Sequence, residues 1–209
     1  MSNYKTVFFI LGVLQIILGL SMIVPIIAQF YYNQVDSGFI GSGLVSIIFG
    51  VLFFLSNLDY EKKLTLPQAF LLTALSWLSI AIFGSLPFVF SDLGLSFTNA
   101  FFESMSGITT TGSTILTNLN ETPKAILLWR AMLQWLGGIG IIVMAITLMP
   151  IMNIGGMQLF VISNTHTPEK ILPKSKEISI RLIVIYSSLT LVCAFFYKIF
   201  GMSFFDSIV

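Results

Sequence analysis

The sequence predicts an all-α integral membrane protein, and three observations lead to this fold class. Of the 209 residues, 56% are hydrophobic and only 9% are charged, and the mean hydropathy is +0.96. A soluble domain carries about 25% charged residues. Five stretches are long and apolar enough to cross the roughly 30 Å hydrocarbon core of a bilayer as helices. We therefore expect the lipid bilayer to surround most of the chain.

The five predicted spans are separated by short connections. They cover approximately residues 7–28, 39–56, 67–90, 124–150 and 179–200. The first span follows Lys5, but it exceeds the apolar core of a secretory signal, which is about 7 to 15 residues long. No small-x-small cleavage pattern follows it, so we predict that it stays in the membrane.

The distribution of lysine and arginine predicts how the spans are oriented. With a cytoplasmic N-terminus, seven of these residues lie inside: Lys5, Lys62, Lys63, Lys170, Lys174, Lys176 and Arg181. Three lie outside: Lys124, Arg130 and Lys198. Cytoplasmic loops are enriched in positive charge, so the N-terminus is expected to be cytoplasmic. The formal net charge is only +1, and no basic patch favours a nucleic-acid partner.

Composition also argues against a metal site and an active site. The single Cys193 and the single His166 do not provide a Cys/His metal site or an internal disulfide. No paired carboxylates, Ser-Lys pair or Ser-His pair falls at membrane depth, which disfavours an intramembrane enzyme. We expect no covalent cofactor.

A shorter apolar segment lies between the third and fourth spans. Residues 96–108 (SFTNAFFESMSGI) are too few to cross the membrane and too apolar for an ordinary surface loop. Their length predicts a short helix that enters the membrane and returns. With a cytoplasmic N-terminus, this helix enters from outside.

The segment after the short helix contains the candidate site, Thr109, Thr110, Thr111, Gly112 and Ser113. The β-branched threonines favour an extended backbone, and the glycine permits dihedrals that other residues resist. Irregular backbone at membrane depth is tolerated where it lines a water-filled path. Carbonyl oxygens in such a strand can replace the hydration shell of K⁺. The alternative interpretation is a hydroxyl-rich external loop that only caps a bundle.

A short repeat indicates that this unit recurs. Phe101-Phe102-Glu103-Ser104-Met105 returns as Phe204-Phe205-Asp206-Ser207-Ile208, a displacement of 103 positions. Each copy follows an apolar span. The sequence therefore predicts a second unit that starts near residue 179 and a longer polypeptide in which this unit is completed.

Three runs in this sequence resemble one transporter family: FFESMSGITTTGST, LLWRAMLQWLGGIGIIVMAI and GGMQLF. They are similar to the TrkH/TrkG-type subunits of the Trk/Ktr/HKT superfamily of potassium transporters. The resemblance implies two N-terminal transmembrane helices followed by span–pore helix–filter loop–span repeats of a potassium-channel-like pore. K⁺ would be the transported ion, bound at the carbonyls of Thr110 and Thr111, and Gly112 would be the filter glycine.

The resemblance also implies a domain organisation and partners. The expected parts are an N-terminal two-helix domain (1–64), a first complete repeat (65–160), a cytoplasmic linker (161–178) and the start of a second repeat (179–209). Members of this family commonly form homodimers, which implies a homodimer in a bacterial inner membrane. Bacterial members work with a cytoplasmic nucleotide-binding regulatory subunit of the TrkA type. That subunit binds the nucleotide, and this chain has no Gly-rich phosphate loop of its own.

Glu103 is an ionisable residue inside the short helix, where it is costly unless it is paired or hydrated. It either assists the filter or serves as a buried structural partner of Arg130 or Gln134, and we favour the structural role. Two alternatives concern the architecture of the whole chain. A homotetramer with one filter strand per subunit is disfavoured by the two extra helices and the second unit, and a non-conducting membrane scaffold is a further alternative.

Overall fold

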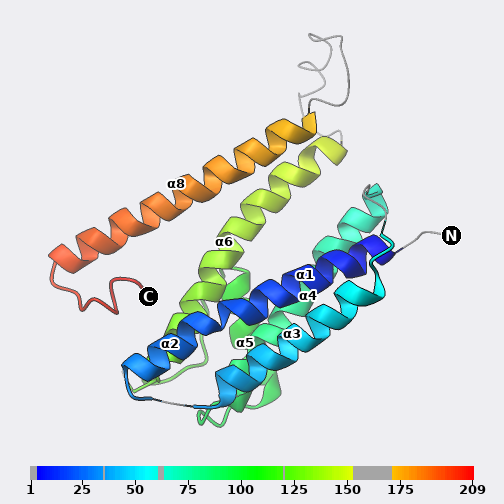
Figure 1. Ribbon diagram of the computed structural model, residues 1–209. Helices are drawn as coiled ribbons and strands as arrows, with labels where there is room; N and C mark the ends of the chain where they lie inside the picture. The colour runs from blue at the N-terminus through cyan, green and yellow to red at the C-terminus, as the bar shows by residue number, and fades with distance from the viewer. Residues whose placement is uncertain (1–3, 35, 61–63, 120, 153–170) are drawn as a thin grey trace. The chain divides into compact units, whose positions relative to one another are not determined.

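The computed structural model describes residues 4–34, 36–60, 64–119, 121–152 and 171–209, and its regular secondary structure in these ranges is entirely helical. The helices are α1 (Lys5–Ser21), α2 (Ile23–Tyr31), α3 (Gly38–Ser56), α4 (Leu66–Phe90), α5 (Phe97–Ile108), α6 (Lys124–Met152) and α8 (Ile171–Ile199) (Figure 1). The chain divides into two compact units, Met1–Gly138 and Ile139–Val209. The predicted all-α class is confirmed.

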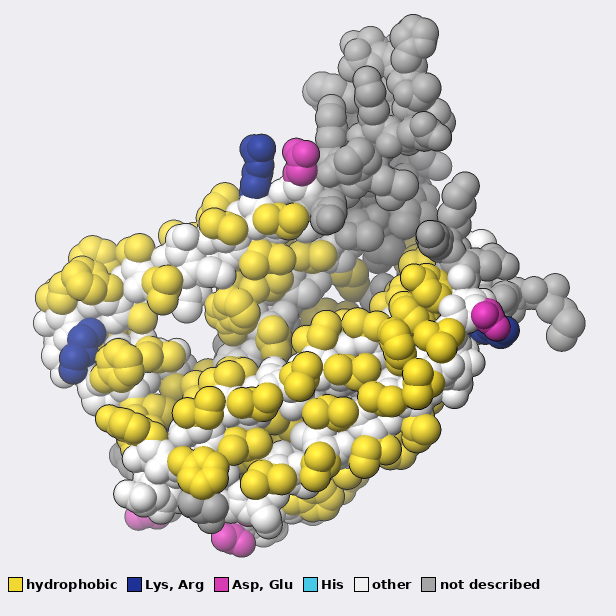
Figure 2. All heavy atoms as spheres, viewed as in Figure 1, with side chains coloured by type: hydrophobic (Ala, Val, Ile, Leu, Met, Phe, Trp, Pro, Cys, Tyr) yellow, Lys and Arg dark blue, Asp and Glu magenta, His cyan; other side chains and the backbone are white. Residues whose placement is uncertain are grey.

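The five predicted spans are also confirmed as long apolar helices. Within the described residues, the segments long and apolar enough to cross a membrane are Lys5–Tyr31, Gly38–Ser56, Leu66–Phe90, Lys124–Ala145 and Glu177–Ile199. In the view of Figure 2, hydrophobic side chains cover the helix surfaces and charged side chains are few. Such a surface is stable where lipid, and not water, is the solvent.

The first span consists of two helices because Pro25 lies within it. Proline has no N–H, so Pro25 leaves the carbonyl of Ser21 without its usual donor four residues later. Helix α1 ends at Ser21, and α2 begins at Ile23. The break is local, since Lys5–Tyr31 still forms one continuous apolar stretch.

Helices α1 and α3 lie side by side (Figure 1) and touch through glycines. A Cβ atom on Gly12 would lie 2.7 Å from the carbonyl oxygen of Gly50, and one on Gly19 would lie 2.9 Å from that of Gly43. These distances are too short for a side chain. Small residues therefore allow the two backbones to approach closely, as is common between membrane helices.

Helix α4 begins with a capping box. The N–H of Thr65 donates to Oε1 of Gln68 at 2.9 Å, and the Thr65 side chain receives the Gln68 backbone N–H in return. Pro67 lies in the first turn, where its missing N–H would have had no partner. The start of this span therefore agrees with the sequence-based prediction to within one residue.

One apolar core joins the helices of the unit Met1–Gly138. Its buried side chains are Leu18, Met22, Phe39, Phe88, Ala100, Leu116, Ala125, Ile126, Trp129 and Leu133. They come from α1, α3, α4, α5, α6 and the connections at Met22 and Leu116. The N-terminal helices therefore pack into the same core as the helices on either side of Thr109–Ser113.

In the second unit, α8 begins at Ile171, eight residues before the predicted start at 179. Pro173 falls in the first turn, where a helix tolerates proline, so the helix can begin before the predicted span. The predicted linker 161–178 thus contains the first residues of this helix. Its part before 171, with His166, and the GGMQLF run lie outside the described residues.

Candidate functional site

The short helix α5 is fixed at its start by a serine cap. The hydroxyl oxygen of Ser96 accepts the N–H of Asn99 at 3.3 Å. This bond satisfies one of the free donors at the N-terminus of the helix. The helix then runs for 12 residues, Phe97–Ile108, which is about 18 Å at 1.5 Å per residue and too short to span a bilayer.

A Schellman motif ends α5 and starts the loop Thr109–Ser113. The N–H of Thr111 donates to the carbonyl of Ser106 at 3.0 Å, and the N–H of Thr110 donates to that of Gly107 at 2.9 Å. This pattern requires a left-handed residue at the second position after the helix, usually glycine. Here that residue is Thr110, with φ of +57°. A β-branched residue is rare in this region, so the conformation is strained.

The five loop residues differ in what their carbonyl oxygens contact. Among the residues that the structure describes, none donates a hydrogen bond to the carbonyls of Thr109, Thr110 or Thr111. In contrast, the carbonyl of Gly112 accepts from Nη2 of Arg130 at 3.0 Å, and that of Ser113 accepts from Oγ of Ser106 at 2.6 Å. The carbonyls in the second half of the loop are therefore hydrogen-bonded, whereas those in its first half have no donor among the described residues.

The threonine hydroxyls are also ordered. Oγ1 of Thr109 donates to the carbonyl of Met105 at 2.7 Å, and it lies 2.8 Å from Oγ1 of Thr111. Both residues are exposed. These contacts tie the hydroxyls of Thr109 and Thr111 back to the end of α5.

Gly112 follows with φ of +81°, a second left-handed residue. A Cβ atom added here would meet nothing within 4 Å. The requirement for glycine is therefore conformational and not steric, because only glycine adopts such dihedrals without strain.

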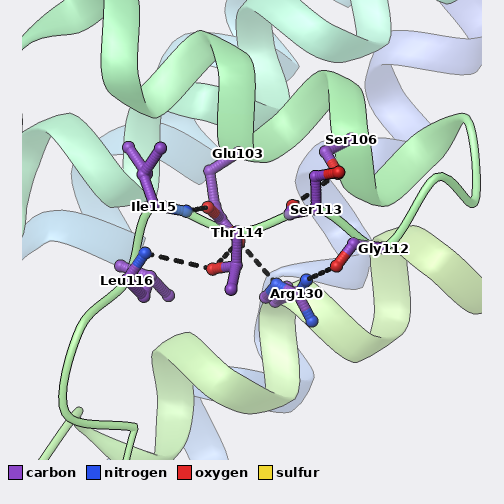
Figure 3. Close-up of polar contacts among 8 residues, drawn as sticks. All are labelled: Glu103, Ser106, Gly112, Ser113, Thr114, Ile115, Leu116 and Arg130. Atoms are coloured by element: carbon purple, nitrogen blue, oxygen red, sulfur yellow. Dashed lines mark hydrogen bonds and ion pairs between the residues drawn. The ribbon is translucent and has the colours of Figure 1, made fainter.

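Glu103 stabilises the segment that follows the loop by accepting hydrogen bonds on the buried side of α5. Its side chain is completely buried in α5 and receives three donors: Oγ1 of Thr114 at 2.8 Å, the N–H of Ile115 at 2.9 Å and Nε of Arg130 (Figure 3). A buried carboxylate is stable only when it is paired and hydrogen-bonded, and all these partners meet that requirement.

Arg130 connects Glu103 with the loop. Its Nε forms the ion pair with Glu103 while its Nη2 reaches the Gly112 carbonyl (Figure 3). The planar guanidinium carries donors in a rigid fork, so a single side chain can hold two acceptors in a fixed geometry. Of the two partners expected for Glu103, the structure brings Arg130 to it, whereas its described contacts do not include Gln134.

Gly137 brings α6 against the end of α5. A Cβ atom on Gly137 would lie 2.7 Å from the carbonyl carbon of Ile108, the last residue of α5. Only a glycine allows this approach. This contact fixes where α5 ends relative to α6.

Some supporting residues are not recognisable from the sequence. Ser106 bonds a carbonyl seven residues later, and Thr114 bonds a carboxylate eleven residues earlier. Both bonds depend on the turn at Thr110, which local sequence patterns do not reveal. The sequence offers one signal for Ser106: it lies three residues after Glu103, and residues three apart share a face of a helix.

The two copies of the predicted repeat differ from each other in local geometry. Oγ of Ser203 accepts the N–H of Asp206 at 3.1 Å, just as Ser96 accepts that of Asn99. This pairing relates Ser96 to Ser203, a displacement of 107 positions and not the predicted 103. The run Phe204–Ile208 follows its serine directly and forms turns, whereas Phe101–Met105 lies in the middle of α5.

The chemistry that this arrangement can support is cation coordination by main-chain oxygens. The carbonyls of Thr109, Thr110 and Thr111 carry partial negative charge at the C-terminal end of a helix, which itself favours cations. The described residues contain no group of three or more His, Cys, Asp or Glu side chains that could hold a metal ion. A weakly hydrated cation suits neutral oxygens of this kind.

Comparison with known proteins gives a consistent set of relatives. The sequence pattern of one family, described as "TrkH: Cation transport protein", matches residues 5–206. The chain is 38% identical over 201 residues to the Trk system potassium uptake protein TrkI of Halomonas elongata, covering 96% of this chain and 41% of the relative. It is 37% identical over 210 residues to TrkH of Escherichia coli K12, covering 99% and 44%.

A solved structure shows the same similarity. The crystal structure of the potassium transporter TrkH from Vibrio parahaemolyticus aligns with a TM-score of 0.86 at 34% identity, covering 99% of this chain and 42% of that one. The chain thus spans less than half the length of the relatives that it matches.

Proposed function

The chain belongs to the TrkH family of cation transport proteins, and we propose that it forms part of the K⁺ translocation pathway of a Trk-type uptake system. It is a multi-pass membrane protein, and the part of the chain that the structure describes contains five apolar helices long enough to span. Its named relatives are potassium uptake proteins, so transport and not catalysis is the activity to expect. Thr109–Ser113 is the proposed selectivity segment.

The open carbonyls of Thr109, Thr110 and Thr111 are the observation that carries this proposal. A cation that leaves water must find oxygens at similar distances, or it does not enter. These three oxygens have no protein donor among the described residues, so they remain available to an ion. We assign K⁺ coordination to them, chiefly to Thr110 and Thr111.

Selectivity also requires that these oxygens hold their positions. The bonds of Gly112 to Arg130 and of Ser113 to Ser106 fix the loop immediately beyond the open carbonyls. A carbonyl has two lone pairs, so Gly112 retains one that a cation can use. The ion pair of Arg130 with the buried Glu103 argues against the alternative of a simple external cap, because such a cap needs no buried carboxylate behind it.

One loop supplies oxygens from only one side of an ion. We propose that the remaining oxygens come from further span–pore helix–loop repeats in the same polypeptide, and the second serine cap at Ser203 supports this. A homotetramer of single loops is the competing arrangement. Mass measurement of the full-length polypeptide in detergent separates them, because a tetramer of single-loop chains contradicts the proposal.

The proposal extends to organisation and partners. Residues 1–64 form the N-terminal helix pair, 65–160 the first repeat and 179–209 the beginning of the second, with a cytoplasmic connection at 161–178. The N-terminus faces the cytoplasm of a bacterial inner membrane. The assembly is a homodimer that binds a nucleotide-binding regulatory subunit of the TrkA type. Family membership and the distribution of lysine and arginine support these assignments.

Cation uptake into liposomes tests the proposed activity. The full-length polypeptide is reconstituted, and entry of labelled K⁺ and Na⁺ is followed under a membrane potential that is negative inside. We expect K⁺ to enter in preference to Na⁺, and excess unlabelled K⁺ to compete with the label. Equal entry of both ions, or no entry by correctly folded protein, would contradict the proposal.

A further inference from the structure

Trp129 is the residue directly before Arg130 in α6, and it is completely buried. Its indole Nε1–H donates to the carbonyl of Gly84 in α4 at 2.9 Å. Its ring also meets Phe39 of α3 edge to face, with the ring centroids 6.2 Å apart and an interplanar angle of 85°. Trp129 therefore links α6 to two other helices, one of them from the N-terminal part of the chain.

The carbonyl that Trp129 uses lies in a weakened turn of α4. Pro87 has no N–H, so it leaves the carbonyl of Phe83, directly before Gly84, without its helical donor. In membrane helices such turns are stabilised by donors from neighbouring helices, since no water is present to replace them. The indole N–H brings a donor from α6 to this turn, at the adjacent carbonyl of Gly84.

Gly84 is also the point where three helices touch. A Cβ atom on Gly84 would lie 2.8 Å from Oγ of Ser104 in α5 and 3.3 Å from Cδ2 of Leu133 in α6. The bond from Trp129 therefore attaches α6 to α4 where α4 also contacts α5. Any rotation of α6 at this level would break that bond.

The position of Trp129 determines the direction of Arg130. Successive residues of an α-helix point about 100° apart, so a helix whose Trp129 faces α3 and α4 must direct Arg130 toward α5 and the loop. Side-chain ends lie roughly 5 to 6 Å from the helix axis, so a rotation of about 10° would move the guanidinium by about 1 Å. That shift is enough to lose a 3.0 Å hydrogen bond such as the one from Arg130 to Gly112.

We propose that Trp129 is a positioning residue for ion selection. By its hydrogen bond to Gly84 and its ring contact with Phe39, it fixes the rotation of α6 that places Arg130 on the Gly112 carbonyl. Through Phe39, the N-terminal helices contribute to the geometry of the loop without contacting it. This inference rests on the proposed role of Thr109–Ser113 in selecting K⁺.

The test compares Trp129→Phe with Trp77→Phe in the full-length polypeptide. Trp129→Phe keeps an aromatic ring against Phe39 but removes the N–H donor. Trp77 is a half-buried tryptophan of α4 outside this contact and serves as the matched control. The preference for K⁺ over Na⁺ is measured per folded molecule in liposomes, and the amount and melting temperature of the folded protein are measured beside it.

We expect Trp129→Phe to lower the K⁺ preference by about threefold, as loss of one hydrogen bond predicts, while Trp77→Phe leaves it unchanged. A purely structural residue would change the amount or melting temperature only, so an unchanged preference per folded molecule overturns the inference. Phe39→Leu provides a second reading that leaves the indole N–H in place. We expect Phe39→Leu to lower the K⁺ preference by about twofold. If Trp129→Phe does not accumulate, an unchanged preference in Phe39→Leu overturns the inference.

Gly112→Ser in the same assay separates this inference from the proposed function. If Gly112→Ser lowers the K⁺ preference but neither Trp129→Phe nor Phe39→Leu does, only the positioning role is wrong. If Gly112→Ser also leaves the preference unchanged, the role of the loop is wrong as well.

Discussion

The guanidinium of Arg130 donates from Nη2 to the carbonyl oxygen of Gly112 at 3.0 Å, while its Nε pairs with Glu103. One side chain of α6 thus joins the buried carboxylate of α5 to the main chain of the loop. The consequence is a loop fixed at its far end, with the three preceding carbonyls exposed. Both bonds are charge-assisted and therefore stronger than ordinary hydrogen bonds.

Replacing Arg130 with lysine should impair selection more than folding. A lysine ammonium can remain near Glu103, but it lacks the planar fork that reaches Gly112 at the same time. Hydrogen bonds to charged groups contribute about 1.5 to 3 kcal/mol, so we expect the K⁺ over Na⁺ preference to fall by about tenfold. Arg181→Lys, at an exposed position of α8, is the matched control. Equal preferences in the two variants would show that the Gly112 contact has no role in selection.

Replacing Glu103 with glutamine should impair folding more than selection. The substitution leaves Arg130 without its counter-charge, and breaking a buried pair costs about 3 to 5 kcal/mol, less here because Arg130 is 19% exposed. We expect several-fold less folded protein and a lower melting temperature, with a smaller change in K⁺ preference than in Arg130→Lys. Glu121→Gln, at an exposed site, should change neither. Normal accumulation combined with lost preference would instead make Glu103 a direct contributor to selection.

Replacing Thr110 with glycine should separate stability from selection. Threonine at φ of +57° carries a strain of about 1 to 2 kcal/mol that glycine does not. Part of this gain is offset by the greater freedom of glycine in the unfolded chain, so the melting temperature should stay the same or rise. The K⁺ preference should fall because the carbonyls become less constrained.

Thr117→Gly is the control for this prediction, because Thr117 is exposed in the same connection and is not left-handed. It should lower stability slightly and leave the ion preference unchanged. A marked destabilisation by Thr110→Gly would mean that the threonine side chain, and not its backbone, stabilises the turn.

Replacing Gly137 with alanine should prevent α6 from packing against the end of α5. The new Cβ atom would lie 2.7 Å from the carbonyl carbon of Ile108, and backbone on both sides leaves no flexible group to yield. We expect a strong loss of folded protein, measured by size-exclusion chromatography in detergent. Gly41→Ala in α3 is the control, because nothing lies within 4 Å of its Cβ position. Similar yields for both variants would show that α6 can shift without cost.

Much of the fold could be predicted because membrane spans are defined by length and hydropathy. The five spans and the short helix before Thr109 follow from these two properties alone. The ends of the helices do not follow from these two properties. Pro25 divides the first span into two helices, and Pro173 lies inside a helix that begins before its predicted start. In both cases the helix boundary depends on whether the N–H that proline lacks would have had an acceptor within the helix, and not on composition.

The candidate site was only partly predictable for a similar reason. The glycine at 112 and the pair of Glu103 with Arg130 follow from residue types and their cost in a membrane. The Schellman turn at Thr110 and the bond from Ser106 to Ser113 do not, because threonine is an unusual residue in a left-handed position. The contribution of Trp129 depends on a contact between residues 45 positions apart.

The most direct measurement is the K⁺ over Na⁺ preference of Gly112→Ser in the full-length polypeptide, set against Gly94→Ser. Both glycines are left-handed, with φ of +81° and +63°, and neither Cβ position has an atom within 4 Å, so the substitutions impose the same kind of backbone strain. That strain is about 1 to 2 kcal/mol, which corresponds to roughly tenfold in an equilibrium. We predict that Gly112→Ser lowers the preference by about this factor while Gly94→Ser retains it. An unchanged preference in Gly112→Ser would contradict the assignment of Thr109–Ser113 as the segment that selects the ion.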